Sequence, residues 1–141
     1  MCDFISERAA QLLNSPRFKS NLQVVGLSQS PAHTKGTMHL TLQTLSGKLI
    51  ASNHEVHILD KISLDLPRAQ ISTDVLTKVK PFILADPSFH LPGPIDMLIG
   101  STLFPLLLTN ETHSLGPNMP HVVGTEFGFV VMGSAPCVLP S

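Results

Sequence analysis

The chain has 141 residues, of which 43% are hydrophobic and 13% charged, and its nine basic and ten acidic side chains give a formal net charge of -1. This length suits one compact domain and not two, so we expect residues 1–141 to form a single globular domain. A near-neutral chain offers no basic surface for nucleic acid or for an anionic membrane, and we expect neither as a partner.

No segment is typical of a membrane span or a secretion signal. The most apolar window, Met97 to Leu108, is about half as long as a bilayer requires and contains Pro105. Met1 to Arg8 mixes charged and apolar residues, unlike a signal peptide. We therefore expect an intracellular, cytoplasmic protein, in which Cys2 and Cys137 are free thiols.

The first predicted element is a short helix that Ser6 caps and that ends at Asn14 and Pro16. Its apolar side chains are expected on one helical face: Ile5, Ala9, Leu12 and Leu13. Leu22 to Leu27 is then strand-like, and the polar segment Gly26 to Gly36 suits a hairpin or loop.

A β-hairpin is predicted next. From Thr37 to Leu45, apolar and polar residues alternate with the period of a strand that has one wet face. Ser46 to Lys48 provides a turn, and Leu49 to Leu59 forms the partner strand. His54 and His57 fall on opposite faces of that strand, so they cannot hold a metal ion together, and we expect no metal site and no cofactor.

The second half of the chain mixes strands, short helices and a proline-rich connection. Asp60 to Pro67 alternates and is predicted as a strand, and Ser72 or Thr73 could cap a short helix bearing Val75, Leu76 and Val79. Four prolines then favour an irregular connection: Pro81, Pro87, Pro92 and Pro94. The remaining predicted elements are a strand at Pro94 to Gly100, a helix at Ser101 to Leu108 and strand at Val122 to Met132.

The most diagnostic segment is the apolar run Met97, Leu98, Ile99 and Gly100. It is expected as a buried strand whose end is crowded by another backbone, which is why it stops at glycine. Together, the elements predict a mostly β fold with two or three short helices.

Five segments in order resemble the aspartic peptidase domain of Pao/BEL-type retrotransposon polyproteins. The similarity covers nearly the whole chain, and the segments are Phe4–Leu13, Val24–Leu27, Leu84–Phe89, Pro94–Gly100 and Thr125–Gly133. The resemblance implies a retropepsin-like lobe, a closed or partly open β-barrel, that needs a second copy to be active. It implies a homodimer that cleaves a peptide or polyprotein substrate, because two paired carboxylates activate a water molecule.

The catalytic triplet of that family is absent from these residues. None of the six aspartates, Asp3, Asp60, Asp65, Asp74, Asp86 and Asp96, is followed by Ser or Thr and then Gly. The resemblance places the catalytic Asp-Ser-Gly loop before Met1, so the chain is expected to lack that loop and the strand before it, and to be inactive as it stands. Thr102 and Phe129 are smaller departures, where relatives commonly have Asp and Trp.

Other residues receive roles from the resemblance or from local chemistry. The resemblance implies a substrate-covering flap at Gln23 to Gly36, with Val25, Gly26, Leu27 and Gly36 as its residues, and makes Asp60 to Pro94 an insertion. It makes Met97 to Gly100 the strand that braces the catalytic loop.

Three aspartates can be assigned from their neighbours. Asp3 is expected at a helix entry or in a loose terminus rather than in catalysis, since Phe4 and Ile5 cannot supply a glycine turn. Asp96 is expected to cap or salt-bridge a strand start, and Asp86, before Pro87, to form a turn.

Two alternatives to a peptidase remain open. The chain could be a catalytically dead module that dimerises or binds an extended peptide by strand addition. It could also be a retroelement remnant with no function. A serine-hydrolase reading of Gly26 to Ser30 is not supported, because the closing glycine of a nucleophile elbow is missing.

Overall fold

The computed structural model describes residues 2–20, 23–24, 32–63, 65–135 and 137–138. These residues are mostly β with a few short helices, as predicted, and their strands form four separate sheets and no closed barrel. The chain divides into two compact units, residues 1–65 with 94–106 and residues 66–93 with 107–141. The single domain expected from length stays a prediction.

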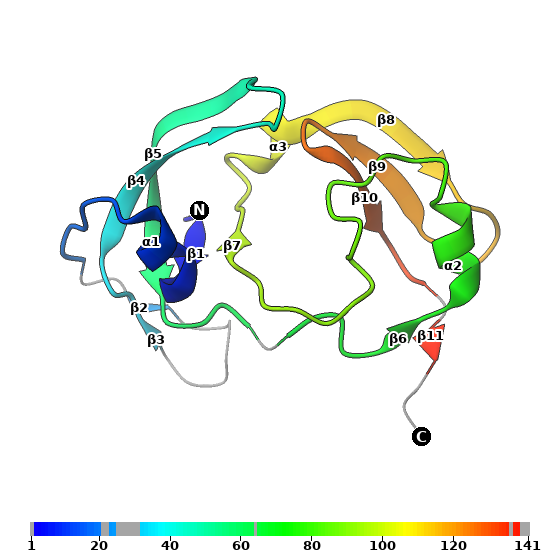
Figure 1. The fold of residues 1–141 in the computed structure, drawn as a ribbon, viewed down its shortest axis with the longest axis horizontal. Coiled ribbons are helices and arrows are strands. Elements are labelled where there is room, and N and C mark those ends of the chain that lie inside the picture. The colour runs from blue at the N-terminus through cyan, green and yellow to red at the C-terminus, as the bar shows by residue number, and fades with distance from the viewer. Residues whose placement is uncertain (1, 21–22, 25–31, 64, 136, 139–141) are drawn as a thin grey trace. The chain divides into compact units, whose positions relative to one another are not determined.

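The first unit is built on a four-stranded sheet in the order β4-β5-β1-β7 (Figure 1). The strands are β4 (Thr37–Gln43), β5 (Leu49–Leu59), β1 (Phe4–Ser6) and β7 (Met97–Leu98). The hairpin of β4 and β5 is antiparallel, β1 runs parallel to β5, and β7 is antiparallel to β1. The short N-terminal strand is therefore enclosed on both edges.

The β4–β5 hairpin confirms the prediction from alternation. The amide of Thr44 donates to the carbonyl of Lys48 at 2.9 Å, and Gly47 takes the positive φ of 93° that this turn requires. Met38 and Val56, which are neighbours in the register, are both fully buried. The alternation of the sequence matches the two faces of the hairpin only in part, because Thr37 on the predicted wet face is also buried.

Helix α1 (Glu7–Leu13) also lies where it was predicted. The hydroxyl of Ser6 accepts a hydrogen bond from the amide of Ala9 at 3.1 Å, and Asn14 ends the helix in the left-handed conformation with φ of 51°. The predicted apolar face is wrong, however, because Ala10 is the buried residue and Leu12 is 81% exposed. Ile5 belongs to strand β1, so the helical spacing counted from it does not apply.

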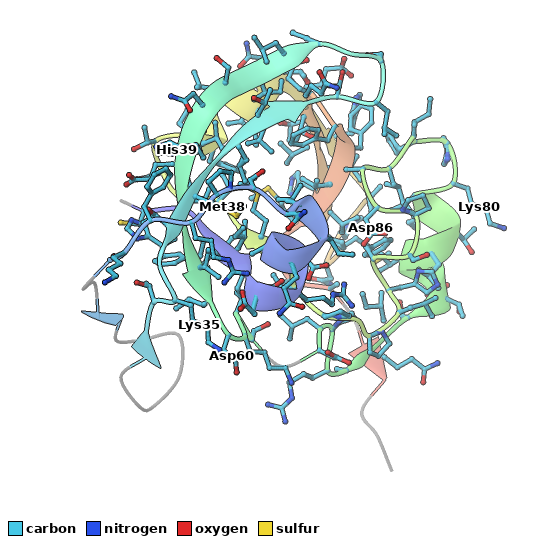
Figure 2. All side chains as sticks on the ribbon, turned by 60° about the vertical axis from the view of Figure 1, so that its left-hand side comes forward. Lys35, Met38, His39, Asp60, Lys80 and Asp86 are labelled. Carbon is cyan, nitrogen blue, oxygen red and sulfur yellow. The ribbon has the colours of Figure 1, made fainter. Side chains whose placement is uncertain are left out.

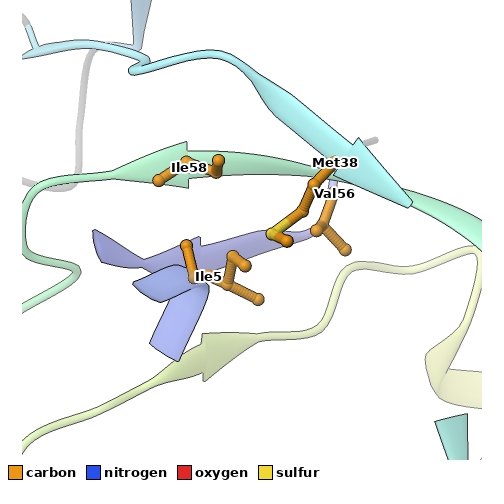
Figure 3. Close-up of a cluster of buried hydrophobic side chains, with 5 residues drawn as sticks. Ile5, Met38, Val56 and Ile58 are labelled. Atoms are coloured by element: carbon orange, nitrogen blue, oxygen red, sulfur yellow. The ribbon is translucent and has the colours of Figure 1, made fainter. Parts of the chain in front are cut away.

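The core of the first unit lies where β1, β4, β5 and α1 meet. Its buried members are Ile5, Ala10, Met38, Val56 and Ile58. Figure 3 shows Met38, Val56 and Ile58 gathered around Ile5. Burial of the Ile, Met and Val side chains, each worth about 1.5–3 kcal/mol, is the main force that holds the short strand β1 in the sheet.

A small hairpin of β2 (Gln23–Val24) and β3 (Ala32–His33) occupies part of the segment predicted as strand and loop. The proposed flap residues Val25, Gly26 and Leu27 lie outside the described residues.

The second unit contains the three-stranded antiparallel sheet β10-β9-β8 and helix α2 (Thr73–Lys78). Its strands are β8 (Leu108–Ser114), β9 (His121–Thr125) and β10 (Gly128–Met132). A separate two-stranded sheet pairs β6 (Gln70–Ile71) with β11 (Cys137–Val138). The buried core of this unit consists of Val75, Val79, Leu115 and Val122. The segment predicted as C-terminal strand is a hairpin of β9 and β10. The helix predicted near Ser72 is confirmed as α2.

Two predictions for the middle of the chain need correction. Asp60 to Pro67 is not a strand: its described residues contribute only the isolated bridge between Leu66 and Gly93. The predicted helix at Ser101 to Leu108 is reduced to α3 (Phe104–Leu107), with Pro105 in its first turn, where a missing N–H costs nothing. Searched over the described residues, the chain has no helix of the length and apolarity that a bilayer crossing requires.

Candidate functional site

Two of the five segments of the resemblance, Phe4–Leu13 and Pro94–Gly100, meet at the start of β1. Phe4 pairs with Leu98 and Ile5 with Met97, although these residues are more than ninety positions apart. The amide of Ser6 donates to the carbonyl of Asp96 at 2.9 Å. The structure therefore places Met97 and Leu98 directly beside the first residues of β1.

Asp3 is buried at this point, with 3% of its surface exposed. One carboxylate oxygen accepts the amide N–H of Gly100, and the other is hydrogen-bonded to Nε2 of His54. The carbonyl of Asp3 accepts the amide N–H of His57 at 2.9 Å. The expectation of a helix entry or a loose terminus is wrong, because Asp3 connects β1 to β5 and to the residue that follows Ile99.

These contacts define what Asp3 can do chemically. Each of its oxygens has one partner, and with only 3% of the residue exposed, little of the carboxylate is open to a catalytic water. A retropepsin-type site needs two carboxylates close enough to share a proton, and Asp3 is one carboxylate facing an imidazole and an amide. We assign Asp3 and His54 a positioning role, in which they hold Gly100 against the start of β1.

Asp96 forms a second polar cluster at the same end of the sheet. Its carboxylate accepts from the hydroxyl of Ser6 at 2.8 Å and from Arg8, whose terminal nitrogen lies 2.5 Å away. The hydrogen bond from Arg8 lowers the pKa of Asp96, with a smaller contribution from Ser6, and burial opposes this shift. The predicted structural role of Asp96, a salt bridge at the strand start, is confirmed.

The strand predicted at Pro94 to Gly100 is shorter and more exposed in the structure than expected. Strand β7 comprises Met97 and Leu98 only, and Ile99 and Gly100 follow it without strand structure. Leu98 is 37% exposed, because β7 lies at the end of the sheet and has β1 on one side only. Gly100 is buried, and its carbonyl accepts the amide of Phe104 at 3.0 Å as α3 begins.

Gly36, which is described, unlike the other three residues named for the predicted flap, lies at the entrance to β4. Its φ of 108° is one that glycine adopts without strain, and a Cβ added there would lie 2.6 Å from the carbonyl oxygen of Phe18. Phe18 and Thr37 exchange backbone hydrogen bonds at 2.9 and 2.8 Å. Close packing of two backbones is therefore enough to explain the glycine here.

The other candidate residues take local roles. His57 lies on the opposite face of β5 from His54, as expected, and its ring is 6.0 Å from that of Phe4. Asp86 accepts the amide of Ser88 at 2.9 Å and forms the predicted turn. In the part of the chain that is described, no three His, Cys, Asp or Glu residues are grouped as ligands of a metal ion.

The pairing of Asp3 with His54 and Gly100 has no signal in the sequence. These partners are 51 and 97 residues away, and no spacing rule connects a lone aspartate with either of them. The run Met97 to Gly100 did indicate that the glycine is crowded, but not which group crowds it.

Comparisons of this chain with protein-family models, with curated proteins and with solved structures each found no match. The family is therefore not established by comparison.

Proposed function

We propose that these residues are the greater part of a retropepsin-type aspartic endopeptidase lobe that processes a retroelement polyprotein. The observation that carries the proposal is the pairing of β1 with β7, together with the hydrogen bond from Gly100 to Asp3. In retropepsin-type lobes, an apolar strand ending in glycine lies across the loop that carries the catalytic aspartate. Here Gly100 lies against the residue immediately before Phe4, where such a loop would enter β1.

The proposed chemistry needs an aspartate that these residues do not contain. Two copies of an Asp-Ser-Gly loop, one from each lobe of a homodimer, would share one proton. The ionised member would take a proton from water, and the protonated member would polarise the peptide carbonyl. Because this chemistry needs no metal and no prosthetic group, no cofactor is proposed. The substrate would be an extended peptide, in an intracellular, cytoplasmic setting.

The test is to restore the loop. The chain is produced with an N-terminal extension containing Asp-Ser-Gly-Ser, placed as in the family, and cleavage of a peptide library is measured at about pH 5, where one of two coupled carboxylates can keep its proton. We expect cleavage that is lost when the new aspartate is replaced by asparagine. An extended chain that is folded and dimeric but cleaves nothing would contradict the proposal.

A second candidate function is peptide binding or dimerisation without catalysis. Strand β4 ends the four-stranded sheet, and past its bridge from Phe18 to Thr37 its outer edge pairs with no other described strand. An open edge of this kind can accept an extended peptide or a second copy by strand addition.

This candidate is tested on the chain without an extension, by sedimentation and by peptide titration followed by amide NMR. Amide chemical-shift changes confined to β4 on adding peptide would support it, and so would a dimer in sedimentation that shows the same changes at β4. A monomer with no shifts would argue against it and favour a remnant without function.

A further inference from the structure

A cavity of about 430 Å³ lies in the second unit, between β6, α2 and the segment around His90. Its volume is within the range of small-molecule sites, roughly 300–1,000 Å³. Most of its walls are apolar, contributed by Pro67, Ile71, Leu76, Leu91 and Pro92. Four polar side chains complete it: Arg68, Gln70, Thr73 and His90.

The framework of this cavity is formed by paired backbone on each side. Leu66 and Gly93, which flank the lining segments, exchange two backbone hydrogen bonds of 3.0 Å. Gln70 and Ile71 are fixed by the pairing of β6 with β11. The irregular segments that line the cavity are therefore tied to paired backbone, at Leu66 and Gly93 and at β6, which favours a site that exists before a ligand arrives.

The polar groups at the cavity have unused hydrogen-bonding capacity. Arg68 is exposed and forms no ion pair with any residue that the structure describes. Nδ1 of His90 is buried without a hydrogen-bond partner. Buried polar atoms are paired in the great majority of cases, and because Nδ1 has almost no exposed surface, it is Arg68 that presents an accessible polar group to the cavity.

A second unpaired group is next to the lining segment. The hydroxyl of Ser72 is buried without a partner, although Ser72 stands at the N-cap of α2, where a serine usually accepts an amide N–H. Asp74, the acidic residue of the first turn of α2, does not line the cavity. The charged group that the cavity presents is thus a guanidinium, with no carboxylate among its walls.

We propose that this cavity binds a carboxylate attached to an aliphatic group. A guanidinium matches a carboxylate with two parallel hydrogen bonds. The apolar walls take the aliphatic part. One cation among mostly apolar walls suits a singly charged ligand better than a phosphate dianion. The same chemistry is found in a fatty acid and in the C-terminus of a peptide that ends in an aliphatic residue.

The test is an NMR titration of the whole chain with matched probes. Octanoate is compared with octanol, which has the same chain length without the charge, and N-acetyl-leucine with N-acetyl-leucinamide. We expect amide shifts at Arg68, Gln70 and His90 with the carboxylates, and affinities at least about tenfold weaker for the uncharged analogues. The pair that binds more tightly identifies the source, fatty acid or peptide C-terminus.

Variants decide whether Arg68 is responsible. Arg68→Gln should weaken carboxylate binding at least about tenfold and leave octanol binding unchanged, and Arg68→Lys should weaken it less. Lys80→Gln is the matched control, because Lys80 is an exposed cation of the same unit that does not line this cavity (Figure 2). A melting curve like that of the parent chain verifies that each variant is folded.

Three results would overturn the proposal: equal affinity for octanoate and octanol, shifts that lie away from the cavity, or no shifts at all with millimolar carboxylate. The proposal does not depend on the peptidase function, since its lining residues and its readout are separate from cleavage.

Discussion

Replacing Asp3 by alanine tests how the start of β1 is held. The substitution removes a buried carboxylate and leaves the amide N–H of Gly100 without an acceptor, and it removes the partner of His54. Asp3→Asn is the matched variant, since its side-chain carbonyl can still accept the Gly100 N–H while the charge is lost.

The cost follows from the burial of each partner. An orphaned buried N–H costs about 1–3 kcal/mol, and a hydrogen bond to a charged group contributes about 1.5–3 kcal/mol. The His54 side chain is 24% exposed, so water replaces part of its lost partner and that contribution is reduced. We expect the free energy of unfolding to fall by about 3 kcal/mol for Asp3→Ala and by about 1 kcal/mol for Asp3→Asn.

Urea unfolding followed by circular dichroism measures this difference, because the chain has no Trp or Tyr for fluorescence. With a slope of about 2 kcal/mol per molar urea, the midpoint should fall by about 1.5 M for the alanine variant and about 0.5 M for the asparagine variant. The amide of Ile58, in the neighbouring strand β5, provides an NMR probe within the same unit.

Asp60→Ala is the control, because Asp60 is exposed and its nitrogen-to-oxygen distance to Lys35 is 3.5 Å. It should change stability by no more than about 0.5 kcal/mol. If Asp3→Ala leaves the midpoint unchanged, or if Asp3→Asn is as damaging as Asp3→Ala, then Asp3 does not hold β1 through the Gly100 N–H.

Three further predictions concern the first unit. The pKa of Asp96 is lowered in the folded state, so the carboxylate stabilises the fold above its ordinary pKa, and this stabilisation is lost as the pH falls through the lowered pKa. In Asp96→Asn, the free energy of unfolding measured against pH should therefore change less steeply below about pH 4. Met38→Ala empties a fully buried site and should cost about 2–5 kcal/mol in urea unfolding, and a loss below about 1 kcal/mol would mean that the core closes over the gap. Gly36→Ala should lower the melting temperature more than Gly47→Ala. Both glycines have positive φ, but only at Gly36 would the new Cβ meet a backbone oxygen, that of Phe18 at 2.6 Å. Equal losses of melting temperature would show that φ alone matters.

Some features were predictable because their cause is local. The cap at Ser6 and the stop at Asn14 located α1, and alternation from Thr37 to Leu59 located the β4–β5 hairpin with its turn at Gly47. In each case, the hydrogen bonds join residues a few positions apart. The turn at Asp86 is of the same kind.

Other features escaped because they depend on distant partners. Strand β1 has three residues, too few for a period to be recognised, and it exists because β5 and β7 pair with both of its edges. Alternation at Asp60 to Pro67 predicted a strand, but the described part of this segment has only one isolated bridge. A strand needs a neighbour to satisfy its backbone, which its own sequence does not reveal.

The sequence by itself determined the mostly β composition, the first helix with its caps and the central hairpin, since periodicity and turn chemistry act within a few residues. Tertiary structure alone decided that Asp3 would be buried against His54 and Gly100, and that Arg68 and His90 would line one cavity. These groups meet because strand pairing and core burial bring together segments that are separated by many residues. A buried carboxylate or an unpaired imidazole acquires its role from whatever that packing places beside it.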